Sequence, residues 1–99
     1  MADVERHRQA AIARVLEGKG VATLEARRAA FDNRDVAAGV APLIDKIAKH
    51  AHTITDEDVA AAKRAVSEDE VFELAVCAAI GQATRQLDAA LKAIAEVEP

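Results

Sequence analysis

The sequence predicts an all-α protein: a compact bundle of about five helices that ends in one long helix. Apolar residues recur at helical spacing along most of the chain. Side chains that commonly cap helices stand before several of these stretches, and neither Pro42 nor Pro99 interrupts an expected helix. A chain of 99 residues is near the size at which one core suffices, so we expect a single domain over residues 1–99.

Three helices are expected in the first half, over about residues 3–17, 23–31 and 42–54. The first is amphipathic, and Gly18 follows it as a terminator. Thr23 can cap the second, and residues 32–35 indicate a break. Pro42 suits the first position of the third helix, which we expect to end near Ile54.

A tight helical hairpin is expected in the second half. Thr55, with Asp58 three residues on, marks the start of a short fourth helix that continues to about Ala65. Residues 66–67 then turn the chain into a long helix, from Ser67 to roughly Glu96, around which the chain is organised. Its start carries the capping-box pair Ser67 and Glu70.

The long helix has two apolar faces. One runs its whole length and is predicted to be the core: Phe72, Val76, Ala79, Ile80, Ala83, Leu87, Ala90, Leu91 and Ile94. The other, almost opposite and confined to the first half, comprises Val71, Leu74, Ala75 and Ala78. A helix that is apolar nearly all round lies inside a bundle or in a subunit interface. Gly81 costs helix propensity, which indicates close approach of another backbone.

The composition predicts a homo-oligomer, a dimer or larger. The hydrophobic fraction is 52%, but 25 of these residues are alanine, and the chain has two Phe and no Trp or Tyr. Because alanine buries little area, the core of one chain is thin, and association would supply more buried surface. We expect the subunits to join through the second apolar face, around Leu74 and Ala78.

Charge and cysteine usage exclude several classes. A net charge of −4, with scattered basic residues and an acidic start to the long helix, argues against binding to nucleic acid and ranks a helix-turn-helix regulator last. No apolar run approaches the ~20 residues of a membrane span, and the N-terminus lacks the apolar region of a signal peptide. One cysteine cannot form an internal disulfide. We expect a soluble cytoplasmic protein with no membrane partner.

A motif at the hairpin carries a family resemblance. It consists of Val66, Ser67, Asp69, Glu70, Val71 and Glu73, followed by Ala78, Ala79, Ala90 and Leu91, and it is preceded by residues 55–59, Thr-Asp-Glu-Asp-Val. About half the chain thereby resembles the C-terminal part of the carboxymuconolactone decarboxylase and alkylhydroperoxidase-D-like superfamily. The resemblance implies a small helical fold, an oligomeric habit and, as a possible hetero-partner, a related family protein.

The catalytic motifs of that superfamily are missing. Its redox branch uses a Cys-x-x-Cys pair, whereas this chain has only Cys77, on a different helix. Its decarboxylase branch has a histidine before the turn, where this chain has residues 55–58, and a Tyr-x-Gly-x-Pro segment, where this chain has residues 81–85. The resemblance therefore implies the fold and the oligomeric habit, with no catalytic residue and no cofactor.

Four residues are candidates for a ligand site or an interface: Gln82, Arg85, Glu73 and His50. Gln82 and Arg85 could form a polar pocket floor in which Arg85 binds a carboxylate, with Gly81 leaving room. Alternatively, the helix leaves the core there and Arg85 pairs with Asp88 or with acidic residues of a neighbour. As an enzyme, the protein would need these four groups brought together across subunits.

Three other candidates have a simpler interpretation. His50 and His52 are two residues apart and point about 200° apart on a helix, so we predict no metal site and expect a histidine near a helix C-terminus. Cys77 is expected to be a buried, small hydrophobic residue. Adjacent arginines on a helix diverge, so Arg27 and Arg28 are expected to pair with Glu25 or Asp32 at the surface.

Two functional classes remain open. The preferred one is a noncatalytic module that binds a ligand or interacts with proteins. The alternative is an enzyme of the carboxymuconolactone decarboxylase-like family that acts on a small carboxylate at a subunit interface.

Overall fold

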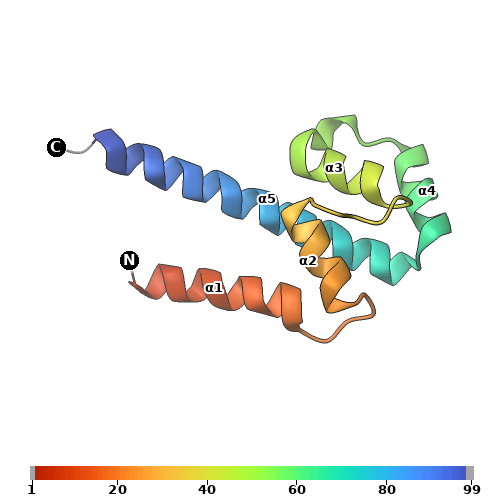
Figure 1. Ribbon diagram of the computed structural model, residues 1–99, viewed down its shortest axis with the longest axis horizontal. Coiled ribbons are helices and arrows are strands. Elements are labelled where there is room, and N and C mark those ends of the chain that lie inside the picture. The colour runs from red at the N-terminus through yellow and green to blue at the C-terminus, as the bar shows by residue number, and fades with distance from the viewer. Residues whose placement is uncertain (1, 98–99) are drawn as a thin grey trace.

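The chain folds into helices joined by short loops (Figure 1). The computed structural model describes residues 2–97 and contains no strand in that range. The elements are α1 (Ala2–Glu17), α2 (Leu24–Asp32), α3 (Ala41–Lys49), the 3-10 helix η1 (Ala51–Thr53), α4 (Asp56–Ala65) and α5 (Glu68–Val97). The prediction of an all-α fold with about five helices and a long C-terminal helix is confirmed.

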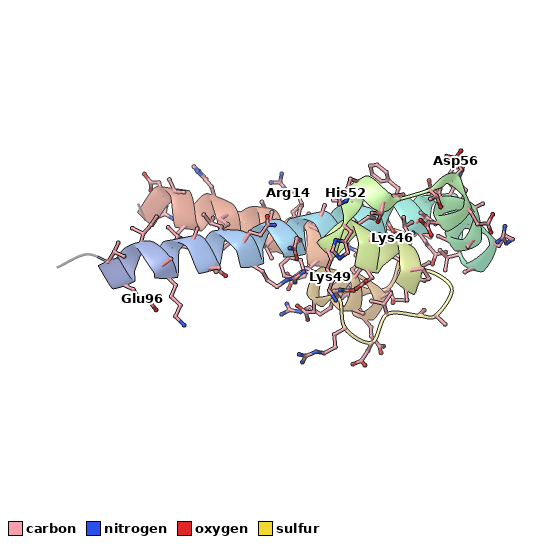
Figure 2. The ribbon with its side chains drawn as sticks, turned by 90° about the horizontal axis from the view of Figure 1, so that it is seen from above. Arg14, Lys46, Lys49, His52, Asp56 and Glu96 are labelled. Atoms are coloured by element: carbon pink, nitrogen blue, oxygen red, sulfur yellow. The ribbon has the colours of Figure 1, made fainter. Side chains whose placement is uncertain are left out.

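The first half of α5 lies at the centre of the molecule. Helices α2 and α3 make the most extensive contacts with it, and α4 leads into it through the tight turn at residues 66–67. Helix α1 and the outer half of α5 project together from this cluster, as both views show, with Glu96 near the tip of α5 (Figures 1 and 2). The described chain is therefore elongated, with extents of 52 × 29 × 20 Å.

The predicted helix starts are confirmed by their hydrogen bonds. The Thr23 hydroxyl accepts the N–H of Ala26 at 3.0 Å. Thr55 and Asp58 form a complete capping box, in which each side chain accepts the backbone N–H of the other residue. At the start of α5, the Ser67 hydroxyl accepts the N–H of Glu70 at 3.2 Å. These local bonds satisfy N–H groups that a new helix leaves open.

The third helix is shorter than predicted. It ends at Lys49, because His50 leaves the helical conformation at φ −146° and ψ 57°. The backbone N–H and the hydroxyl of Thr53 both donate to the His50 carbonyl, at 2.8 and 2.7 Å, and this closes the short turn of η1. Lys46 then joins α3 to α4 through an ion pair of 2.7 Å with Asp58. The hydrogen bond from the Thr53 hydroxyl to the His50 carbonyl is an example of how threonine side chains compete with helix formation by binding the nearby backbone.

The two apolar faces of α5 have roles opposite to those predicted. Helices α2 and α3 cover the side that carries Val71, Leu74 and Ala78, which are 8%, 4% and 0% exposed. Most of the face predicted as core points outward: Phe72 is 71% exposed and Leu87 43%, whereas Ile80 is half-buried and packs against the core. Periodicity locates both faces, but it does not determine which one the other helices cover. The predicted core face and the predicted interface around Leu74 are therefore both wrong.

The exposed face contains a continuous row of apolar side chains, which we call the outer stripe. Its members are Phe72, Val76, Ala79, Ala83, Leu87, Ala90 and Ile94. All are exposed except Val76, which is half-buried. The row spans α5 from its first turns to near its end, so its length is about 33 Å at 1.5 Å per residue.

The backbones of α2 and α5 approach closely at Gly81. A Cβ atom added there would overlap the carbonyl oxygen of Phe31 and lie 2.7 Å from the carbonyl carbon. Helix α2 ends just beyond this contact, where Asn33 adopts the left-handed conformation at φ 50°. The predicted close approach of another backbone at Gly81 is confirmed.

Candidate functional site

Gln82 and Arg85 lie together, but they serve the packing of α2 on α5. One guanidinium nitrogen of Arg85 donates to the Phe31 carbonyl at 2.6 Å, and the other donates to the Gln82 side chain at 3.2 Å. Asp88, an alternative partner considered for Arg85, instead binds Arg8 of α1 at 2.7 Å. Arg85 thus satisfies a carbonyl in the last turn of α2, and the pairing with Asp88 is wrong.

Glu73 holds the loop between α1 and α2. Its carboxylate accepts the backbone N–H of Ala22 at 2.6 Å and that of Val21 at 2.8 Å. These hydrogen bonds, from Ala22 above all, together with the positive charge of Arg27, keep the pKa of Glu73 below its ordinary value. The carboxylate therefore acts as a fixed acceptor for the loop.

Arg27 also holds the loop between α1 and α2, by binding the backbone carbonyls of the loop. It is 5% exposed, and its guanidinium donates twice to the Ala22 carbonyl, at 3.0 and 2.9 Å, and also to the Gly18 carbonyl. The predicted surface pairing is wrong for Arg27 but correct for Arg28, which binds Asp32 at 3.0 Å. Buried carbonyls in a loop need donors from outside the loop, and the sequence did not indicate that Arg27 turns back to bind carbonyls five and nine residues before it.

Replacing Glu73 with glutamine is expected to lower stability at neutral pH by about 1.5–3 kcal/mol, because two hydrogen bonds to a charged acceptor are weakened. A carboxylate whose pKa is lowered by folding contributes stability above its unfolded pKa of about 4.3, and the contribution disappears as pH falls through the folded pKa. Urea unfolding at pH 7 and pH 3 should therefore show a smaller difference between wild type and variant at pH 3. Glu25→Gln, at an exposed position of α2, is the control. An equal difference at both pH values would contradict this role.

His50 caps the C-terminal end of α3, and His52 follows it in η1 (Figure 2). The backbone N–H of His50 donates to the Lys46 carbonyl at 2.7 Å, and the rings of His50 and His52 are 6.3 Å apart in an edge-to-face arrangement. Within residues 2–97, no group of three or more His, Cys, Asp or Glu side chains is placed to hold a metal ion. Nor does a hydrogen bond or ion pair in that range join His50 to Glu73, Gln82 or Arg85.

Cys77 is buried, as predicted, with 1% of its surface exposed. Its thiol contacts the carbonyl of Val15 at 3.7 Å and thereby lies between α5 and the end of α1. Burial raises the pKa of the Cys77 thiol above its ordinary value. The thiol therefore stays protonated at neutral pH, which is typical of a structural cysteine.

A groove of about 540 Å³ lies between α2, residues 33–40 and the start of α5. Its apolar lining includes Ala26, Ala29, Val36, Val40, Val66 and Leu74, and its charged lining includes Glu25, Arg28, Asp32, Arg34, Asp35 and Glu70. The sequence did not indicate this groove, because its walls come from three separate segments. Leu74 belongs to the buried side of α5, so the groove opens away from the outer stripe.

A smaller hollow of about 160 Å³ lies at the start of the outer stripe. It is formed by Phe72 and Val76 of the stripe together with Arg14, Val15, Lys19, Arg27 and Glu73. The neighbouring stretch of α5 from Leu74 to Thr84 contains no charged residue. The outer stripe therefore offers an uncharged apolar surface, which is the composition found at the centre of protein interfaces, with a depression at one end that is lined by both apolar and charged side chains.

The chain was compared with protein-family models, curated proteins and solved structures, and no match was found. The resemblance to the carboxymuconolactone decarboxylase and alkylhydroperoxidase-D-like superfamily stays a prediction. A separate finding concerns the helices: none within residues 2–97 is long and apolar enough to cross a membrane.

Proposed function

We propose that this protein is a noncatalytic interaction module that associates with itself through the outer stripe. The observation that carries the proposal is the exposure of this continuous apolar row on α5, with Phe72 71%, Leu87 43% and Ile94 54% exposed. Soluble proteins seldom leave a contiguous apolar patch uncovered, and such patches mark interaction sites.

The thin interior of the single chain supports the same conclusion. Among the described residues the buried apolar ones number 13, five of them alanine, and none lies beyond Ala78 on α5. The outer half of α5 is held to the rest of the described chain by polar contacts, from Arg85 to the Phe31 carbonyl of α2 and from Asp88 to Arg8 of α1. Helical stability in proteins comes mainly from packing of an apolar face, and a second subunit would supply this packing for residues 82–97.

The catalytic alternative has less support. Glu73 and Arg85, which an enzyme would use as an acid or base and a carboxylate ligand, are occupied by the backbone of Ala22 and Phe31. The 540 Å³ groove has a volume suited to a small ligand, so ligand binding there is a second candidate for the noncatalytic class. A helical fold of the superfamily named above and a cytoplasmic location are part of the same proposal.

The proposal predicts that Ala79→Glu abolishes self-association and leaves the fold intact. Ala79 is exposed in the middle of the outer stripe, so glutamate remains hydrated in a monomer but would be buried in the interface. Sedimentation equilibrium at about 100 μM should give a monomer mass, with an unchanged circular dichroism spectrum.

Ala89→Glu is the matched control, because it makes the same change at an exposed position of α5 outside the outer stripe. It should associate like the wild type. Equal association of the wild type and both variants would exclude the outer stripe as the docking surface.

A further inference from the structure

We infer that the partner on the outer stripe is a second copy of this chain whose α5 packs antiparallel to the first, with a twofold axis passing beside Ala83. This inference rests on the proposed function and specifies the arrangement of the two subunits. It follows from the order of large and small residues along the outer stripe and from the position of the hollow beside Phe72.

The outer stripe has an 11-residue repeat. Phe72, Val76 and Ala79 are followed at the same spacing by Ala83, Leu87 and Ala90, and Ile94 begins the third repeat. Eleven residues turn an α-helix only about 20° past three full turns. The row therefore runs almost parallel to the axis of α5, so two copies can pack along their whole length with little coiling.

The spacing within the row is symmetric about Ala83. In an antiparallel pair centred there, Ala79 faces Leu87 of the second copy, Val76 faces Ala90, and Phe72 faces Ile94. Leu87 and Val76 then each meet an alanine, Ala83 meets its own copy at the axis, and the large pair Phe72 and Ile94 lies at the two ends of the row, so the helices approach closely at the centre. A parallel pair in register would instead place Leu87 on Leu87 and alanine on alanine, which alternates crowding with gaps.

The hollow beside the outer stripe is placed to receive the end of the second copy. Phe72 and Val76 form part of its wall, together with Val15 of α1. In the antiparallel arrangement, Ile94 of the second copy lies opposite Phe72 and can enter this hollow of about 160 Å³. By symmetry, each subunit thus contributes a side chain to a depression in the other, which is the form of an isologous interface.

Electrostatics favour the same arrangement. No member of the outer stripe is charged, so no like charges meet between the two facing rows. The antiparallel orientation also opposes the dipoles of the two helices, whereas a parallel pair aligns them. The 540 Å³ groove faces away from the outer stripe and remains open in both subunits.

Disulfide cross-linking of single-cysteine substitutions tests the arrangement. Facing Cα atoms of helices packed 8–10 Å apart lie roughly 4–5 Å apart, within the range that a disulfide spans. Ala83→Cys should therefore form a covalent dimer rapidly under mild oxidation. Ala79→Cys alone should not, because the two copies of residue 79 are displaced by about 12 Å along the axis. Ala79→Cys mixed with Leu87→Cys should form a covalent heterodimer.

The native Cys77 is buried in the protein, and repeating the experiment in a Cys77→Ala background excludes links through it. Each variant is checked for its helical content and its noncovalent mass before oxidation. Rapid links at residues 79, 83 and 87, each to itself, would overturn the antiparallel arrangement in favour of a parallel one and leave self-association intact. If every variant is folded and remains monomeric, both this inference and the proposed function fail.

Discussion

Replacing Ala78 with glutamate is expected to unfold the chain at neutral pH. Ala78 is fully buried on the side of α5 that α2 and α3 cover. A carboxylate introduced there has no partner, and an uncompensated buried charge costs about 3–5 kcal/mol, which approaches the lower end of the about 5–15 kcal/mol stability of natural domains. Circular dichroism at 25 °C should show a loss of most helical signal.

The neighbouring variant Ala79→Glu is the matched control, because residue 79 is exposed. At a concentration at which the wild type is also monomeric, it should retain the helical signal and differ in unfolding free energy by less than about 0.5 kcal/mol, as surface changes generally do. The reverse result, with Ala79→Glu unfolded and Ala78→Glu stable, would show that the core lies on the face of α5 that carries Ala79, as the sequence predicts.

A large loss of stability is also expected when Gly81 is replaced by valine. Valine at this position would place side-chain atoms on the carbonyl group of Phe31, so α2 would have to move away from α5. The hydrogen bond from Arg85 to the same carbonyl would be lost with that movement. Overpacking of a well-fitted contact costs about 1–3 kcal/mol, and we expect a loss of about 3 kcal/mol in urea unfolding.

Whether Gly81→Ala raises or lowers the unfolding free energy separates two opposing effects, helix propensity and the close approach of Phe31. Helix propensity alone predicts a gain of about 1 kcal/mol for this change. The close approach of Phe31 predicts a loss, because even a single Cβ overlaps the carbonyl oxygen. A more stable Gly81→Ala protein would mean that α2 does not pack against α5 at this point.

Features that depend on neighbours in the sequence could be predicted. The starts of α2, α4 and α5 follow from side chains that bond within three residues, such as Thr55 with Asp58 and Ser67 with Glu70. The requirement for glycine at position 81 was also visible, because a residue that costs helix propensity inside a long helix needs a compensating contact. The fold class follows from the same periodicity.

Features that depend on distant segments could not be predicted. Both faces of α5 are apolar, and only the packing of α2 and α3 determines which is the core. Arg27 and Glu73 look like surface charges, yet they bind the backbone of residues 18–22, up to 52 positions away in the chain. The groove beside α2 likewise requires three segments to meet.

The mass of the unmodified protein in solution tests the central claim most directly. If the outer stripe docks a second copy, sedimentation equilibrium should give a mass that rises with concentration to twice the 10.5 kDa of one chain. The rise should be complete by about 100 μM. A folded protein that stays at 10.5 kDa over the whole concentration range would contradict the claim.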